Sequence, residues 1–372
     1  MYLFYVGIAF LLAFFLELVI IPKVLMVSYK KKLFDEPNER KRHADFTPRL
    51  GGITFLPIVL FALCLTVTIT LHIDPSMGIL EIQEIGFKKL FVEFASLFSC
   101  LVLLYFVGLM DDLVGVRYKA KFFVQIACGV ILVASGVWIS DFNGLLGFNE
   151  IPKWFGYPLT ILLVVYILNA INLIDGIDGL ASGLSIIAFV ALAYCYYLKS
   201  YLLFSLLPVA ALGCLLPFFH FNVFGGGKIR KKKIFMGDTG SLAIGMLLTY
   251  LLIRFTMPNP SDEMGIPVHP NPLIIFSVVL VPCLDVLNVV FYRIRKGHNP
   301  FKPDRNHLHH KLMRLGLSPS RSLIIILLMA ILFIALNFFL VRYTQIKWIF
   351  LIDMVIYSSI YMWLGRKRTN IP

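Results

Sequence analysis

The chain has 372 residues, of which 59% are hydrophobic and 15% are charged, and its mean hydropathy is +0.84. This composition excludes an ordinary soluble domain and is typical of an integral membrane protein. We interpret the formal net charge of +13 mainly as a topology signal on a protein that contacts membrane lipid, and we expect no nucleic acid partner.

Runs of mostly apolar residues, each of about 17 to 25 residues and so long enough to cross a bilayer, recur along the whole chain. The first run lacks the flanking features of a cleaved signal peptide and is expected to remain as a span. No internal repeat or domain-sized insertion interrupts the series, which predicts a single all-α, polytopic membrane helix bundle over residues 1–372. We expect about eleven transmembrane helices, at about 2–27, 51–73, 91–110, 122–140, 155–171, 183–199, 202–219, 239–257, 272–294, 322–342 and 348–364.

Lys and Arg residues are concentrated in alternate loops between these spans, and such loops usually stay in the cytoplasm. Because the loop after the first span is strongly basic, we place that loop inside, the N-terminus outside and the C-terminus in the cytoplasm. Nearly all polar residues suited to chemistry then share the cytoplasmic face, where they are expected to form one site. They lie in five loops, at about 28–50, 111–121, 172–182, 220–238 and 295–321.

The first of these loops contains Arg42 and His43, and the glycine pair Gly51 and Gly52 follows it. Cationic side chains next to an unobstructed backbone can approach a phosphate closely. Taken alone, however, this loop is better explained as a basic anchor on the cytoplasmic side of the membrane.

The second loop begins with Asp111 and Asp112, directly after the apolar run 101–110. Adjacent carboxylates at a membrane boundary are costly unless something binds them. Such a pair suits Mg²⁺, which in turn commonly binds a diphosphate. Lys121 and Gln125 are four residues apart and share a helix face, so they are expected to point at the same site. The structural alternative is helix capping with mutual neutralisation of charge.

The third loop has two acidic residues in a glycine-rich junction between apolar spans. Asn172, Asp175 and Asp178 recur every three residues, so a helical turn would place them on one face. An asparagine and two carboxylates can hydrogen-bond a base or a ribose. Asn, Asp and Gly also break helices, so a simple cap and turn is the alternative.

The fourth loop contains a basic run at 228–233, and Phe235 and Asp238 follow it at the start of another span. Asp238 is expected to be the third carboxylate of the site, because a helix N-terminus there would leave it close to both backbone N–H groups and a cation. The alternative role for Asp238 is an N-cap. The basic run itself is more typical of a solvated surface that faces lipid headgroups.

The fifth loop contains Arg305, His307, His309 and His310 within a few residues. The histidines could bind Zn²⁺, but we favour a clamp for a phosphate or sugar, because no cysteine or other fixed ligand for zinc accompanies them on this face. Asp285, in the preceding span, is expected to form an internal pair or to orient this loop.

These clusters, in this order, resemble the polyprenyl-phosphate N-acetylhexosamine-1-phosphate transferase superfamily, glycosyltransferase family 4. The similar segments are 35–52, 111–125, 169–180, 235–241 and 300–312. The segment 303–310 and the expected number of spans look like the branch that uses UDP-N-acetylglucosamine, rather than the branch that uses UDP-N-acetylmuramoyl-pentapeptide. The chain departs from the family pattern after Asn222, where 225–233 replaces a short connection, and the roles of Asn222 and of this loop stay open.

The resemblance implies transfer of N-acetylglucosamine-1-phosphate from UDP-N-acetylglucosamine to undecaprenyl or another polyprenyl phosphate, with release of UMP. This would be the initiating step of a cell-envelope glycan in the bacterial cytoplasmic (inner) membrane, with Mg²⁺, or Mn²⁺ in its place, as cofactor. By motif position, the resemblance implies catalytic roles for Asp111, Asp112 and Asp238, metal ligation by Asp112 and Asp238, and nucleotide binding by Asn172, Asp175, Asp178 and Phe235. It implies phosphate or sugar binding by Lys121, Arg305, His307, His309 and His310, and lipid-phosphate binding by Arg42 and His43.

Several alternatives stay open at this point. The donor could be another UDP-N-acetylhexosamine or the muramoyl-pentapeptide, and the acceptor phosphate could attack directly or through a phospho-aspartate at Asp111; we favour direct attack. A transporter or flippase would predict polar residues at mid-membrane and repeated halves, neither of which is evident. A noncatalytic scaffold would leave the carboxylates unexplained. A homodimer is neither predicted nor excluded.

Overall fold

The computed structural model describes residues 1–33, 47–74, 76, 77, 79–142, 144, 145, 150–225, 233–257, 276–297, 299 and 306–366. Three predicted site residues lie outside these ranges, namely Arg42, His43 and Arg305. Nearly all of the basic run at 228–233 lies outside them too, with Lys233 as its one described residue.

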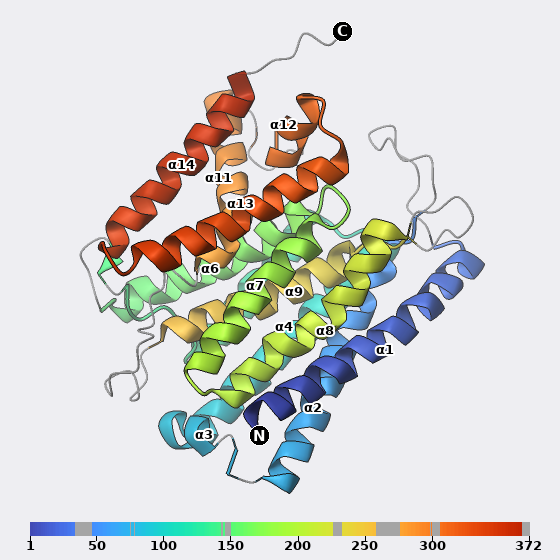
Figure 1. Ribbon diagram of the computed structural model, residues 1–372, viewed down its shortest axis with the longest axis vertical. Helices are drawn as coiled ribbons and strands as arrows, with labels where there is room; N and C mark the ends of the chain where they lie inside the picture. Colours follow the sequence, from blue (N-terminus) through green and yellow to red (C-terminus); the bar gives the residue numbers. More distant parts are fainter. Residues whose placement is uncertain are drawn as a thin grey trace.

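The described part of the chain is built from helices, which confirms the predicted all-α membrane bundle (Figure 1). The helices are α1 (Tyr2–Lys31), η1 (Leu50–Thr54), α2 (Phe55–Ile73), α3 (Ile79–Ile85), α4 (Phe87–Val114), α5 (Tyr118–Ala134), α6 (Lys153–Ile174), α7 (Leu180–Leu198), α8 (Leu202–Phe224), α9 (Gly237–Thr256), η4 (Ser277–Val279), α11 (Leu280–Arg295), α12 (Leu308–Arg314), α13 (Pro319–Leu340) and α14 (Ile346–Arg366).

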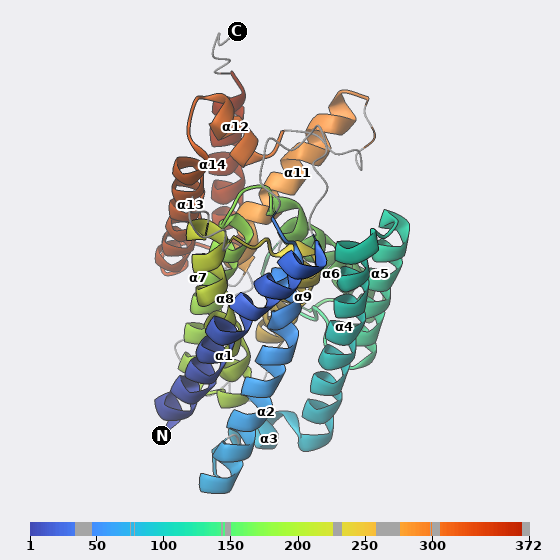
Figure 2. The same ribbon diagram turned by 90° about the vertical axis from the view of Figure 1, so that its right-hand side faces the viewer.

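Within the described residues, 10 helices are long and apolar enough to cross a membrane, against the eleven that we expected. The segment expected as the remaining span is α5, which has 17 residues and ends at Ala134, close to the lower limit of about 17 residues for a crossing. The start of α1 and the end of α14 lie at opposite ends of the bundle (Figures 1 and 2). A chain whose first and last helices leave the bundle at opposite ends must cross it an odd number of times. Ten crossings would not satisfy this condition, whereas eleven, with α5 included, do.

Helix α9 forms the centre of the bundle, and every residue from Thr239 to Thr256 is buried. It packs against α4, α6 and α7. A helix that contacts protein on all sides does not need a lipid-compatible surface, so α9 tolerates glycine and polar residues that an outer helix would expose to lipid. The large exposed apolar side chains lie instead on outer helices such as α1, α4, α13 and α14, as expected for lipid contact.

Helices α4 and α9 are in contact near both of their ends. At one end, Gly108 of α4 is so close to α9 that a Cβ atom there would lie 2.5 Å from the Thr239 Cα atom. At the other end, the Arg254 Nε atom lies 3.0 Å from the Glu93 Oε2 atom, and both side chains are buried. A buried ion pair of this kind can fix the register of two packed helices.

The connections predicted to carry the site gather at one end of the bundle. In Figure 2, α4 ends and α5 and α7 begin at the upper ends of these helices, and α12 lies above them. Segments that are far apart in the sequence are thereby brought together at one end of the helix bundle.

Candidate active site

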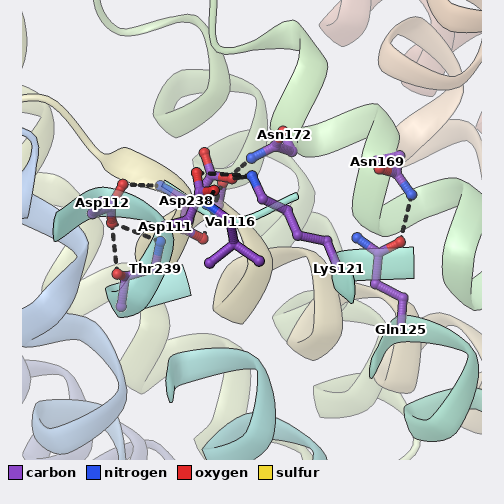
Figure 3. A network of polar contacts seen from close by, with 10 residues as sticks. Asp111, Asp112, Val116, Lys121, Gln125, Asn169, Asn172, Asp238 and Thr239 are labelled. Atoms are coloured by element: carbon purple, nitrogen blue, oxygen red, sulfur yellow. Dashed lines mark hydrogen bonds and ion pairs between the residues drawn. The ribbon is translucent and has the colours of Figure 1, made fainter. Parts of the chain in front are cut away.

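Asp112, near the end of α4, caps the first turn of α9 (Figure 3). Its Oδ1 atom accepts the backbone N–H of Asp238 at 2.8 Å, and its Oδ2 atom accepts the backbone N–H of Thr239 at 3.0 Å and the Thr239 hydroxyl at 2.6 Å. Gly237 has a φ of +70°, and a Cβ atom there would lie 2.6 Å from Asp112 Oδ2, so this tight approach requires glycine. A carboxylate at a helix N-terminus also interacts favourably with the helix dipole.

Lys121 joins the other two carboxylates of the site. Its ammonium lies 2.8 Å from Asp111 Oδ2 and also contacts Asp238 Oδ2 (Figure 3). The second oxygen of Asp111 accepts the backbone N–H of Val116 at 2.7 Å. The structure thus brings all three predicted carboxylates and Lys121 into one site, and their chemical roles stay predictions.

The three carboxylates differ in how well they suit Mg²⁺. No group of three His, Cys, Asp or Glu side chains suited to a metal ion occurs within the described ranges. Asp111 and Asp238 nevertheless converge on one cationic position, which the ammonium of Lys121 fills. Because Mg²⁺ typically takes one or two carboxylates and completes its shell with substrate phosphates and water, this pair fits the ion. Asp112 fits less well, since α9 engages both of its oxygens.

Gln125 differs from the expectation that it shares the site with Lys121. Its Oε1 atom accepts a hydrogen bond of 2.7 Å from the Asn169 side chain, away from the carboxylates (Figure 3). Lys121 and Gln125 do lie on the same helix, α5. The hydrogen bond to Asn169, however, holds the Gln125 side chain in the contact between α5 and α6.

The third predicted cluster is present, although not as a single helical turn. Helix α6 ends at Ile174, so Asn172 belongs to α6 whereas Asp175 and Asp178 lie in the connection to α7. The Asn172 side chain donates to Ser241 Oγ at 2.8 Å, which places the end of α6 next to the start of α9. Asp178 forms an ion pair of 2.6 Å with Lys233.

Asp175 has an unusual electrostatic environment. Desolvation by the surrounding protein is the largest cause, and repulsion by the carboxylates of Asp178, Asp238 and Asp112 adds to it. Together these effects raise the pKa of Asp175 to about 7. Its side chain is still exposed to solvent, so a ligand can reach it. Several carboxylates that repel one another in a small region are typical of a site that binds a cation or a hydrogen-bond donor.

Asn222 connects the third and fourth loops. Its Oδ1 atom accepts the backbone N–H of Gly179 at 2.6 Å, and its side-chain amide donates to the Ile234 carbonyl at 2.7 Å. Asn222 therefore has a structural role that the sequence left open.

Phe235 lies next to the segment that contains the glycine pair. Its backbone N–H donates to the Pro48 carbonyl at 2.8 Å, and its own carbonyl accepts from Gly51 at 2.9 Å. A Cβ atom on Gly52 would lie 2.2 Å from the Gly240 Cα atom. Close packing, on α9 for Gly52 and on Phe218 of α8 and the Phe235 carbonyl for Gly51, thus explains the two glycines without an approach to a phosphate. The ring of Phe235 is half-buried, and Lys233 Nζ lies 5.3 Å from its centroid.

The histidines of the fifth loop lie next to one another, and the rings of His307 and His309 are stacked. The rings of His307 and His309 are 5.9 Å apart, and those of His309 and His310 are 4.1 Å apart. His309 is buried against Gly176, and neither of its ring nitrogens has a hydrogen-bond partner within the part of the chain that the structure describes. Burial, with smaller effects of His310 and His307, lowers the pKa of His309 to about 3, so its ring is neutral at pH 7.

Asp285 orients this group, as one of the two sequence-based alternatives expected. Its Oδ2 atom lies 2.7 Å from His307 Nδ1, and its Oδ1 atom accepts the backbone N–H of Leu308 at 2.8 Å. Sequence reasoning missed Tyr361, whose hydroxyl donates to the Asn306 carbonyl at 3.0 Å. A tyrosine in an apolar span carries no local signal of such a contact. Thr239, by contrast, lies inside a recognised motif and could have been included.

Comparison with known proteins agrees with this geometry. Residues 94–256, which include Asp111, Asp112, Asp175, Asp178 and Asp238, match the model of the family described as glycosyl transferase family 4. The chain is 30% identical over 329 residues to the undecaprenyl-phosphate alpha-N-acetylglucosaminyl 1-phosphate transferase of Yersinia pestis, which covers 87% of this chain and 82% of that protein.

Two further relatives give the same result. The protein of the same name from Escherichia coli K12 is 29% identical over 341 residues, with 90% of this chain and 84% of the relative covered. The probable undecaprenyl-phosphate N-acetylglucosaminyl 1-phosphate transferase of Bacillus subtilis is 29% identical over 335 residues, with 88% and 82% covered. The similarity extends over the membrane helices and the acidic site alike, and the chain therefore belongs to glycosyl transferase family 4, as a multi-pass membrane transferase.

Proposed function

We propose that the enzyme transfers N-acetylglucosamine-1-phosphate from UDP-N-acetylglucosamine to a polyprenyl phosphate, undecaprenyl phosphate in bacteria, and releases UMP. The observation that carries the proposal is the convergence of Asp111 and Asp238 on one cationic position at an end of the membrane bundle. The names of the three relatives support the same donor and acceptor.

In this proposal, Asp111 and Asp238 hold Mg²⁺, for which Mn²⁺ can substitute. When bound, the ion neutralises charge on the diphosphate of the donor. Asp112 acts mainly through α9, because its three hydrogen bonds fix the turn that carries Asp238. Lys121, released from the two carboxylates, then contacts a phosphate.

The reaction is a phosphoryl transfer with a single displacement at the sugar-linked phosphorus. An oxygen of the lipid phosphate forms a new bond to this phosphorus, while the bond from the phosphorus to UMP breaks and UMP leaves with the electron pair. The lipid phosphate is already anionic near pH 7, since its second pKa is about 6, so no covalent enzyme intermediate is needed. Direct attack also agrees with Asp111, because one of its oxygens accepts the backbone N–H of Val116 and the other would bind the metal ion in place of Lys121.

The remaining residues are proposed to bind the two substrates. Asn172, Asp175, Asp178 and Phe235 hold the uridine, and His307, His309 and His310 with Arg305 hold the sugar and diphosphate. Arg42 and His43 are proposed to bind the lipid phosphate. We further propose that the site faces the cytoplasm, where nucleotide sugars are made, which requires the N-terminus outside and the C-terminus inside.

The test is UMP release by the purified protein given undecaprenyl phosphate, Mg²⁺ and UDP-N-acetylglucosamine. We expect UMP only when lipid and metal are both present, loss of release with EDTA, and its return with Mg²⁺ or Mn²⁺. Release with a different UDP-sugar but not with this one would keep the reaction and refute the donor. Silence with every UDP-sugar would refute the transferase itself. Inversion at the transferred phosphorus would support direct attack, and retention would refute it.

A further inference from the structure

Asp285 is a buried carboxylate on α11 that the mechanism above does not use. It is fully buried, and both of its oxygens contact the histidine segment, one at His307 Nδ1 and the other at the backbone N–H of Leu308. Burying a charged group without partners is expensive. A carboxylate held in this position by two contacts to one segment therefore indicates a specific task for that segment.

A second contact fixes the same segment from the last helix. The Tyr361 hydroxyl donates to the carbonyl of Asn306, the residue before His307, at 3.0 Å. Lys311, on the first turns of α12, donates back to the Tyr361 carbonyl at 3.1 Å. Helices α11 and α14 thus hold the histidine segment from two sides.

The histidines held in this way contact the loop between α6 and α7, which carries Asp175 and is proposed to bind the nucleotide. The ring of His307 lies parallel to that of His309, with an interplanar angle of 9°. The His309 ring in turn packs on Gly176, so closely that a Cβ atom there would lie 2.3 Å from Nε2. Gly176 directly follows Asp175. A displacement of His307 would therefore be transmitted to the loop that carries Asp175.

We propose that Asp285 is a positioning residue for the transfer reaction, which sets the orientation and tautomer of His307, and that Tyr361 of α14 positions the same segment through Asn306. The inference rests on the proposed function. With Nδ1 of His307 facing the Asp285 carboxylate, Nδ1 carries the proton and Nε2 is the ring nitrogen that meets the donor. A carboxylate partner commonly fixes the tautomer of a functional histidine in this way.

Asp285→Asn is the sharpest variant, because it keeps the size of the side chain. The asparagine oxygen can still accept the Leu308 N–H, so the start of α12 keeps its cap. Its NH₂ group then faces His307 Nδ1 and forces the proton onto Nε2. We expect kcat to fall about 10- to 100-fold, the usual cost of losing such a partner, with a smaller change in the KM for the donor.

A double-mutant cycle separates positioning from general stability. If Asp285 acts through His307, then Asp285→Asn should cause little further loss in a His307→Ala background. Asp353→Asn is the matched control, because Asp353 is also a fully buried carboxylate and pairs with Asn337 at 2.8 Å, within the α13–α14 pair. Its kcat should stay close to that of the wild type.

Tyr361→Phe tests the second contact by removing one hydroxyl. We expect a loss of about 3- to 10-fold in kcat, which corresponds to one hydrogen bond. Tyr343→Phe, at an exposed position, is its control.

The outcomes distinguish this inference from the proposed function. A wild-type enzyme that is silent with every donor refutes the proposed function. An active wild type with an equally active Asp285→Asn variant refutes the inference, as does a loss that persists in full when His307 is already alanine. Unfolding temperatures in detergent identify any variant that fails by misfolding. If Asp285→Asn misfolds, the Asp285→Glu variant, which keeps the carboxylate, must be active if the inference is correct.

Discussion

Replacement of Asp112 by asparagine tests whether the cap on α9 controls the position of Asp238, the carboxylate that we propose to bind the metal ion. The native carboxylate accepts two backbone N–H groups and the Thr239 hydroxyl through its two oxygens. Asparagine has the same shape but offers only one acceptor oxygen. Its NH₂ group must therefore face at least one N–H donor of α9, and the negative charge at the helix N-terminus is lost.

The size of the effect follows from these contacts. Each hydrogen bond to a charged group contributes about 1.5 to 3 kcal/mol, and a charge at a helix terminus contributes about 0.3 to 1 kcal/mol. Loss of one such bond and of the charge together gives about 2 to 4 kcal/mol. If Asp238 must stay in place for the reaction, the rate falls about 30- to 1000-fold. Thr239→Val removes only the hydroxyl contact and leaves both backbone contacts of the carboxylate, so it should cost about 1.5 kcal/mol, the lower end of the range for one such bond, or roughly tenfold.

The assay is UMP release at a series of Mg²⁺ concentrations, with Thr239→Ser as the matched control that keeps the hydroxyl. Both damaging variants should need more Mg²⁺ for half-maximal release, because the carboxylate of Asp238 is no longer fixed. The reasoning is refuted if Asp112→Asn keeps more than half of the wild-type rate. It is also refuted if Thr239→Val is as damaging as Asp112→Asn, since one hydroxyl cannot account for the whole cap.

Three further outcomes are expected. Gly52→Ala should lower the unfolding temperature and the activity, because its Cβ atom would lie 2.2 Å from main-chain atoms of α9; Gly7→Ala, which has open space, should do neither. The pKa of Asp175 is raised to about 7 in the folded chain. Between about pH 4 and pH 7 the folded chain therefore keeps a proton on Asp175 that the unfolded chain has lost. This difference lowers the free energy of unfolding as the pH rises. Asp175→Asn should therefore raise the unfolding temperature in metal-free buffer, with a gain that grows from about pH 4 to pH 7 and then levels off; a gain that shrinks with pH would contradict this. Glu93→Gln should destabilise the bundle by about 3 to 5 kcal/mol in denaturant unfolding, because it removes the carboxylate from the buried Arg254, and a double change of both residues to methionine should recover most of that loss.

The class of the molecule and the residues proposed for its site could be predicted from the order of the amino acids alone. Apolar length is a property of consecutive residues, so the spans could be located without any knowledge of packing. The same holds for the acidic pair Asp111 and Asp112, which is conspicuous because a membrane boundary makes unpaired charge costly. The shared face of the loops followed from counting crossings, and α5, with 17 residues, shows how one short helix affects that count.

The partner of each polar side chain, in contrast, became evident only from the packing of the helices. Asp112 and Thr239 are 127 positions apart, and no local pattern reports that α4 ends beside the start of α9. Gln125 was expected at the site because helical spacing fixes the face of a residue. Only the packing of α6 shows that the Gln125 side chain accepts a hydrogen bond from Asn169 instead. Tyr361 illustrates the same limit, since its hydroxyl reaches the Asn306 carbonyl only because α14 packs next to that residue. Hydrogen bonds depend on distances of about 3 Å between segments, and the arrangement of the helices sets these distances.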